Sequence, residues 1–239
     1  MKRHGQRAQA MVEFLIIIPV LILLIFGAVQ AAFIYSAKTG LNYATFQAAR
    51  LGAMNNAQYA DIRRGLLRGM NPMFSQFEDD ARRMEQTATE IDNFVLITRI
   101  SPDAAAFNAW AVPHTDPLGN GENIPAIPND NLMYRPMQQS PVSIQDANLL
   151  KIRVQYCMRL IVPMVDRLLS ATSRFVDRAN TNRAPASFRD VSRNTSANYA
   201  DICRARQGYV VTAEATVRMQ SAAVDDPDQC TSGGRMICP

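Results

Sequence analysis

The chain has 239 residues, 48% of them hydrophobic, and a formal net charge of +4 at pH 7. This length is enough to bury a real core, and so small a charge is no argument for nucleic acid as a partner. The sequence contains no G-x-S-x-G elbow, no phosphate-binding loop and no H-E-x-x-H, so we expect a protein that is not an enzyme and binds no cofactor. Because the four cysteines lack CxxC spacing and the only two histidines lie far apart, we also expect no metal site.

The first predicted element is a membrane-spanning helix over residues 14–37. No charged residue occurs between Glu13 and Lys38, and the apolar run exceeds the roughly 20 residues that cross a bilayer as a helix. Basic residues precede the run, and such flanks stay on the cytoplasmic side. We therefore expect one membrane pass, with everything after Lys38 on the far side of the membrane.

A cleaved secretory signal is the alternative interpretation of this segment. It would also have a basic start and an apolar core, with a small-residue cleavage site at residues 29–31. We disfavour it because the apolar run continues through Phe33 and Ile34, and because the helical pattern continues past Lys38. The acidic Glu13 at the border of the apolar run is also unusual in such a signal.

The helical pattern extends well beyond the apolar run. Small and apolar residues recur every three or four positions and so share one helix face: Ala37, Leu41, Ala44, Ala48 and Leu51. A face of small side chains lets another backbone come close. We predict one long rod that ends near residue 54, half in lipid and half outside, and that packs against like helices.

A mixed head follows a break at Asn55 and Asn56. Periodicity predicts helices over residues 57–69, from residue 71 to about 91, from Pro102 to Trp110, and from Pro163 to about 176. Alternation and β-branched residues predict strands over residues 94–100, 150–160 and 209–220. The class is therefore α+β, with a small sheet of at least three strands and several helices.

Two details of this head carry further expectations. The strict alternation of strand 150–160 predicts one buried face and one solvent-exposed face, with Cys157 on the exposed face. Residues 113–141 contain many prolines, so we expect a long loop without sheet, whose polar tip is a candidate contact surface. Residues 177–207 are polar and are also expected to form a loop.

The four cysteines all follow the apolar run: Cys157, Cys203, Cys230 and Cys238. In an oxidising compartment an even number predicts two disulfides, and four cysteines allow three pairings between which the sequence alone cannot choose. Local geometry favours Cys230 with Cys238, which would close a short loop. That pairing leaves Cys157 with Cys203.

The border of the apolar run suggests a specific role for Glu13. A carboxylate in an apolar setting costs several kcal/mol unless it is paired. If the chain were cut after Ala8, Gln9 would carry a new amine, and a neighbouring subunit's amine could pair with Glu13 and set the register of a helix bundle. The alternative is a carboxylate at the membrane surface that stays hydrated.

The first 54 residues resemble a known family. The segment QRAQAMVEFLIIIPVLILLIFGAVQ is similar to the N-terminal signature of TadE-like proteins, the minor pseudopilins of tight-adherence (Flp-type) pilus systems. The segment AARLGA at residues 48–53 is similar to the family's Ala-Ala-Arg-x-Gly-Ala. The resemblance implies a basic leader at residues 1–8, a membrane and packing helix at residues 9–54, and an exported, pilin-like head at residues 55–239.

The resemblance also implies how the protein works. A prepilin peptidase would cut between Ala8 and Gln9, which places Glu13 at position five, although the family usually has glycine where this chain has Ala8. The product would be a structural component in assembly, initiation or tip of the adhesive pilus, with other pilins or pseudopilins and an assembly platform as partners. It would lie in the bacterial inner membrane with a cytoplasmic N-terminus and a periplasmic head, extracellular once assembled. The alternative is an uncleaved, membrane-anchored binding module that recruits an envelope partner.

Overall fold

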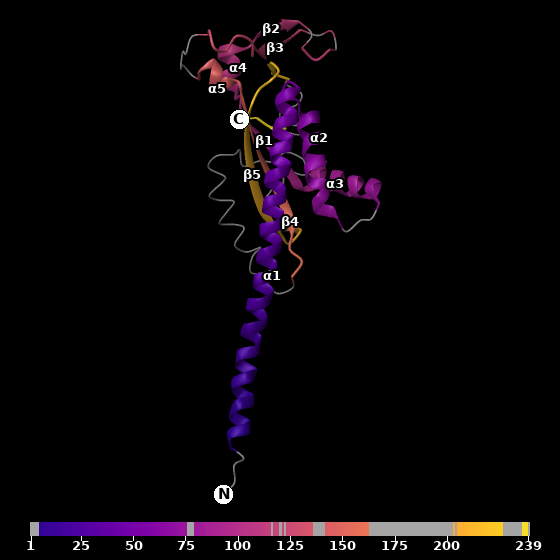
Figure 1. Cartoon of the computed structure of the whole chain (residues 1–239), viewed down its shortest axis with the longest axis vertical. Coiled ribbons are helices and arrows are strands. Elements are labelled where there is room, and N and C mark those ends of the chain that lie inside the picture. The colour runs from indigo at the N-terminus through magenta and orange to yellow at the C-terminus, as the bar shows by residue number, and fades with distance from the viewer. Residues whose placement is uncertain are drawn as a thin grey trace.

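The computed structural model describes most of the chain as a helical rod that carries a mixed head (Figure 1). The described residues are 5–75, 79–115, 117–119, 121, 123–135, 142–162, 203, 205–226 and 236–238, with side chains described from residue 11 onward. The helix predicted from Pro163, and the predicted loop at residues 177–207 apart from residues 203 and 205–207, lie outside this set. The architecture is α+β, as the sequence predicts.

The rod is a single helix, α1 (Gly5–Met54), whose first half projects below the head and whose second half runs along it (Figure 1). Pro19 lies inside the helix, where its missing N–H removes one intrahelical bond. The helix ends in a left-handed turn, with positive φ at Asn56 and Ala57. The Ala53 carbonyl accepts hydrogen bonds from the N–H groups of Gln220 and Ser221, so the end of α1 is tied to the C-terminal part of the head.

The chain then reverses along α1. The helix α2 (Tyr59–Met70) packs antiparallel to α1, and the 3-10 helix η1 (Asn71–Phe74) follows it. The helix α3 (Asp80–Phe94) begins later than the sequence pattern predicts, because the Asp79 side chain accepts the Ala81 N–H at 3.1 Å and caps the helix there. The single helix expected from residue 71 to 91 is therefore wrong at its first turns.

The central sheet has four strands in the order β5-β4-β1-β7. It comprises β1 (Val95–Ser101), β4 (Leu149–Arg159), β5 (Gly208–Arg218) and the short β7 (Met236–Ile237), all antiparallel neighbours except the parallel β1–β7 pair. The three longer strands are those that alternation predicts. The second half of α1 lies against β4 and β5, and the core between helices and sheet includes fully buried Leu41, Ile62, Leu150 and Ile152.

Both faces of β4 are buried over most of its length, which contradicts the predicted solvent-exposed face. Arg153, Gln155 and Cys157 are only 8%, 5% and 0% exposed. Arg153 can be buried because its guanidinium lies 2.6 Å from the Glu214 carboxylate on β5, and Cys157 because it is disulfide-bonded to Cys203. Alternating polarity therefore does not mean alternating exposure when the polar residues have partners.

A second sheet lies at the end of the head farthest from the N-terminus (Figure 1). It contains β2 (Val112–Thr115), β3 (Asn123–Ile127) and β6 (Ala223–Val224), and the short helices α4 (Ala104–Trp110) and α5 (Ile144–Ala147) lie at the same end. The expectation of a loop without sheet over residues 113–141 is therefore wrong. Pro113 and Pro125 lie directly opposite each other in the antiparallel register, at a non-hydrogen-bonded pair where neither missing N–H is needed between the strands.

Candidate functional site

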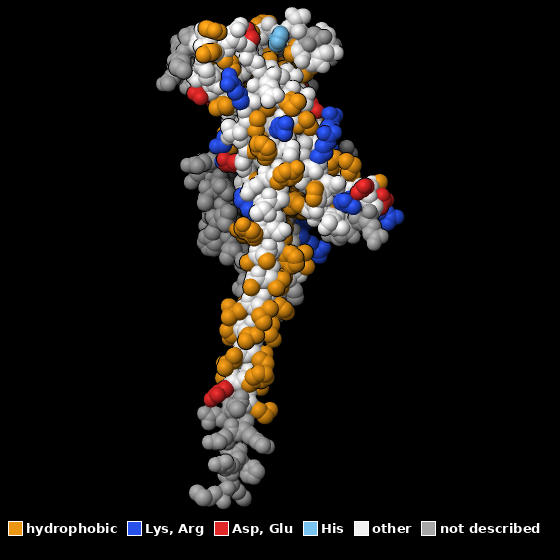
Figure 2. Space-filling model, viewed as in Figure 1, with side chains coloured by type: hydrophobic (Ala, Val, Ile, Leu, Met, Phe, Trp, Pro, Cys, Tyr) orange, Lys and Arg blue, Asp and Glu red, His pale blue; other side chains and the backbone are white. Residues whose placement is uncertain are grey.

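The first half of α1 is apolar and almost wholly exposed. Large side chains such as Phe14, Leu15 and Leu24 are 64%, 71% and 68% exposed, and Figure 2 shows hydrophobic side chains along the visible face of the projecting helix. Within the part of the chain that the structure describes, α1 is the one helix long and apolar enough to cross a membrane, and none of its most apolar stretch is buried in the protein. Such a surface requires an apolar environment such as lipid or other helices.

The predicted processing site lies at the start of this helix. The backbone of Ala8 and Gln9 is helical, and their side chains are outside the described residues. Glu13 is exposed and is the only acidic residue of α1. Gln9 and Glu13 are four residues apart in the helical backbone. If the chain is cut after Ala8, the new amine of Gln9 and the carboxylate of Glu13 in the same chain lie about one helical turn apart along the axis.

The second half of α1 has the opposite character. Its alanine face is buried, and the glycines of α2 contact it: a Cβ built on Gly65 would lie 2.7 Å from the Ala48 Cα, and one on Gly69 would lie 2.4 Å from the Ala44 Cα. The close backbone approach that the sequence predicts is present, but the partner is a helix of the same chain. This face of the rod is consequently not available for packing against like helices.

Two polar contacts attach the head to α1 between its two halves. Gln30 is fully buried, and its Oε1 accepts a hydrogen bond from the Val162 N–H at 3.1 Å. Two turns further along, the Lys38 ammonium donates to the Thr212 carbonyl of β5. The sequence predicts neither contact, because the partners of Gln30 and Lys38 lie more than a hundred residues away along the chain.

A buried ion pair holds the adjacent part of the head together. The Arg206 guanidinium makes two parallel hydrogen bonds of 2.7 Å to the Glu90 carboxylate and stacks 3.7 Å from the Phe94 ring centroid. The Tyr156 hydroxyl donates to the same carboxylate at 3.3 Å. Burial, and then the Glu90 charge, raise the pKa of Tyr156, so its hydroxyl stays protonated and remains a donor. This cluster joins α3, β4 and the turn before β5, and it has no sequence signature.

The cysteine pairing agrees with the sequence argument where the structure describes it. Cys157 and Cys203 form a disulfide across 46 residues of sequence. Cys238 is disulfide-bonded as well, whereas Cys230, its predicted partner, lies outside the described residues. Cys157 and Cys203 are both buried, at 0% and 1% exposure, so this bond is part of a small core with Leu96 and Val210 rather than a surface link.

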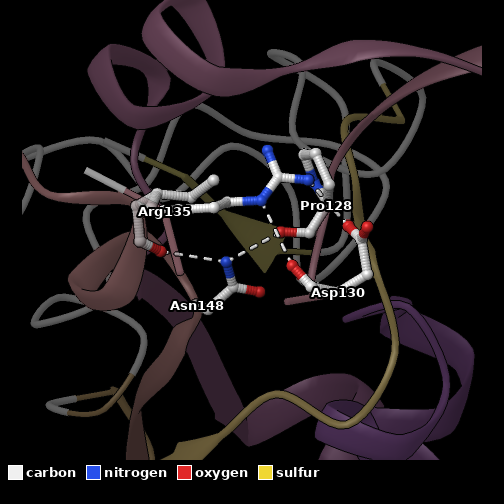
Figure 3. Close-up of polar contacts among 5 residues, drawn as sticks. Pro128, Asp130, Arg135 and Asn148 are labelled. Carbon is white, nitrogen blue, oxygen red and sulfur yellow. Dashed lines mark hydrogen bonds and ion pairs between the residues drawn. The ribbon is translucent and has the colours of Figure 1, made fainter. Parts of the chain in front are cut away.

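The predicted contact loop presents two large side chains at the distal end of the head. Met133 and Tyr134 are 89% and 85% exposed. The turn that carries them is braced, as Figure 3 shows: the Arg135 guanidinium reaches the carbonyl and carboxylate of Asp130, at 3.1 and 2.8 Å, and the Asn148 side chain donates to the Pro128 carbonyl at 3.0 Å. A braced turn can present an apolar pair at little entropic cost.

No group of three potential metal ligands occurs among the described residues. The exposed apolar surface of α1 is the strongest candidate for a functional site. The family model for TadE-like protein matches residues 8–50, and this confirms the resemblance over the segment that spans the predicted processing site, the apolar half of α1 and its alanine face. The match indicates a component associated with a tight-adherence pilus. No curated protein and no solved structure matches the chain.

Proposed function

We propose that the chain is a minor pseudopilin, a structural, non-enzymatic component in assembly, initiation or tip of a tight-adherence pilus. The observation that carries this proposal is that the family match and an unusual division of surface occur in the same helix, α1. The family match over residues 8–50 covers a helix whose first half exposes a fully apolar surface and whose second half is fixed to a folded head. A helix built in this way can stay in the membrane and pass into a bundle of like helices without unfolding the head.

In this proposal the leader is removed at the cytoplasmic face of the inner membrane. A prepilin peptidase cuts between Ala8 and Gln9, and the new amine of one subunit pairs with the Glu13 carboxylate of its neighbour. In an apolar bundle neither charge is favourable alone, so the pair fixes the axial stagger between rods. The head is then periplasmic before assembly and extracellular afterwards.

The packing of α2 limits where rods can touch. Since α2 and the central sheet cover one side of residues 37–53, lateral contacts there must use the opposite side, where Tyr43, Phe46 and Met54 are 56%, 49% and 50% exposed. With the exposed Thr39 and Arg50 between them, these side chains extend the exposed surface of residues 11–29 toward the head. We propose that this exposed side of α1, rather than the buried alanine face, contacts neighbouring pilins or pseudopilins and the assembly platform.

The second candidate function is an uncleaved, membrane-anchored binding module that recruits an envelope partner. The observation that favours it is the braced distal turn, which displays Met133 and Tyr134 far from the membrane end of α1. Large exposed apolar side chains on a preorganised turn are typical of binding surfaces. Under this alternative, Glu13 has no register to set and stays hydrated at the membrane surface.

The mature N-terminus distinguishes the two functions. The full chain is expressed with a prepilin peptidase, purified from membranes, and analysed by intact mass and N-terminal sequencing, with a catalytically inactive peptidase as control. We expect a chain that starts at Gln9, and faster cutting in Ala8→Gly because glycine is the usual family residue before the cut. A chain that still starts at Met1 with both sequences would favour the binding module, and a start near Ala32 would exclude both functions.

A further inference from the structure

The end of strand β4 exposes an apolar side chain close to the membrane helix. Beyond Arg159 the chain continues through Leu160, Ile161 and Val162; Leu160 and Val162 are buried at 6% and 8% exposure, whereas Ile161 is 68% exposed. A single exposed isoleucine is ordinary on a protein surface, so its meaning depends on whether it extends a larger apolar surface. Here the adjacent surface is the apolar half of α1.

The depth of this segment follows from its hydrogen bond to α1. The Val162 N–H donates to Gln30, so residues 160–162 lie at the height of Gln30 along the helix. A helix rises about 1.5 Å per residue, which puts Gln30 about 26 Å from Glu13 along the axis. Because the hydrocarbon core is about 30 Å thick, a carboxylate at its near edge places Gln30 and residues 160–162 at its far edge.

The surroundings of Gln30 fit this position. A glutamine that faced acyl chains would leave its amide unsatisfied, which is costly. Instead the side chain is fully buried and bonded to Val162, although its Nε2 has no partner within the described part of the chain. The head therefore covers the one strongly polar side chain at the end of the apolar run.

A cavity of about 610 Å³ opens at the same level. Phe33 of α1, Ile161 and Arg159 all line it. The Arg159 side chain is exposed at the end of β4, and a guanidinium with an apolar stem suits the phosphate layer above an acyl surface. An apolar side chain at the level of the acyl chains with an arginine beside it can pack against a phospholipid surface, because the arginine stem is apolar and its guanidinium can reach the phosphates.

We propose that the head rests on the outer surface of the bilayer through residues 159–161, with Ile161 among the upper acyl chains and Arg159 at the lipid phosphates. This contact is a second attachment besides α1, and it rests on the proposed membrane anchoring of that helix. It fixes the rotation and tilt of the head relative to the membrane, and it must break when the subunit leaves the membrane for a filament.

Tryptophan quenching by brominated phospholipid tests the contact. The chain has a single tryptophan, Trp110, in the distal helix α4, so the parent protein reports the unquenched background. The full chain and the variants Ile161→Trp, Leu24→Trp and Met133→Trp are each reconstituted into two sets of vesicles of phosphatidylcholine and phosphatidylglycerol. The acyl chains carry bromine near the carbonyl end in the first set and near the methyl end in the second. Leu24 lies within the proposed span and Met133 on the distal turn, and all three replaced side chains are more than half exposed.

We expect the emission added by Ile161→Trp to fall in the first set, and the emission added by Leu24→Trp to fall by about the same factor in the second. The emission of Met133→Trp should match unbrominated controls in both. Adding Arg159→Gln should reduce the quenching of Ile161→Trp only in vesicles with the anionic lipid. Quenching of Leu24→Trp without quenching of Ile161→Trp overturns the bilayer contact and leaves the anchor intact. Absence of quenching in Leu24→Trp overturns the anchor, and with it both proposals.

Discussion

The two halves of α1 show how one helix can serve two environments. Residues 11–29 carry large apolar side chains that point outward on all sides, and none of them is buried in the protein. Residues 37–53 carry small side chains on one face, against which α2 packs with its backbone at Gly65 and Gly69. The first half depends on its surroundings for burial, whereas the second is buried by its own chain. Partners can therefore contact the exposed first half of α1, but not the face of the second half that α2 covers.

The largest effect should come from removing the carboxylate of the exposed half. Replacing Glu13 by alanine should leave membrane insertion intact, since it removes a charge from an apolar helix, but should reduce incorporation into pili by more than about tenfold, because breaking a charge pair in an apolar bundle leaves the other charge uncompensated. Immunoblots of sheared pili and of membranes measure both quantities.

The control for that variant is Glu85→Ala, which removes an exposed carboxylate of α3 from the head. It changes the net charge equally and should incorporate normally. Normal incorporation of Glu13→Ala would contradict the register role and leave the first half of α1 as a plain anchor.

The next largest effect concerns the head alone. The disulfide between Cys157 and Cys203 closes a loop across 46 residues, for which loop entropy predicts about 4 kcal/mol of stabilisation. Replacing both cysteines by alanine should lower the unfolding free energy of the head by about this amount. Urea titration in detergent, followed by Trp110 fluorescence, measures the loss, and membrane insertion of α1 should not change. Unaltered urea stability would show that packing around Leu96 and Val210, not the bond, fixes this region.

A pair of glycines compares the two halves of α1 directly. Gly69→Ala would place a Cβ 2.4 Å from the Ala44 Cα, so α2 must move away from α1, at a cost of about 1–3 kcal/mol. Gly27→Ala meets nothing within 4 Å and should be neutral or slightly stabilising, because alanine favours a helix. Thermal unfolding by circular dichroism distinguishes them, and equal effects would mean that α2 does not pack as closely as the structure shows.

The smallest predicted effect is the pH dependence of the exposed edge of the central sheet. Burial of Glu214 by itself raises the pKa of its carboxyl, but hydrogen bonds from Arg153 and Lys151 outweigh it, and the pKa is lowered below its ordinary 4.5. The stabilisation is then present above the unfolded pKa and is lost as pH falls through the lower, folded value. Because the side chain is 37% exposed, solvent screening keeps the contribution below about 1 kcal/mol.

Substituting Glu214→Gln should therefore flatten the fall in head stability on acidification below about pH 4.5. Urea midpoints measured between neutral pH and acid, with Glu85→Gln as the matched variant without these partners, provide the comparison. An acid slope that Glu214→Gln leaves unchanged would mean that Arg153 and Lys151 do not hold this carboxylate in solution.

The sequence by itself determined the elements that depend on local periodicity. The rod, the helix at residues 59–70 and the three long strands follow from spacings of three to four or of two, because those spacings decide which side chains share a face. The segment around Glu13 was also readable, since order and spacing alone carry the match over residues 8–50. The sequence favoured the pairing of Cys157 with Cys203 without determining it, and the structure confirms that pair.

Only the tertiary structure decided what is buried and by which partner. The hairpin of β2 and β3 forms within a proline-rich segment because Pro113 and Pro125 face each other, and the polar face of β4 is buried because Arg153 meets Glu214. The bonds from Val162 to Gln30 and from Arg206 to Glu90 join residues more than a hundred positions apart. Such contacts leave no local pattern, because a polar residue is equally polar whether water or a distant partner satisfies it.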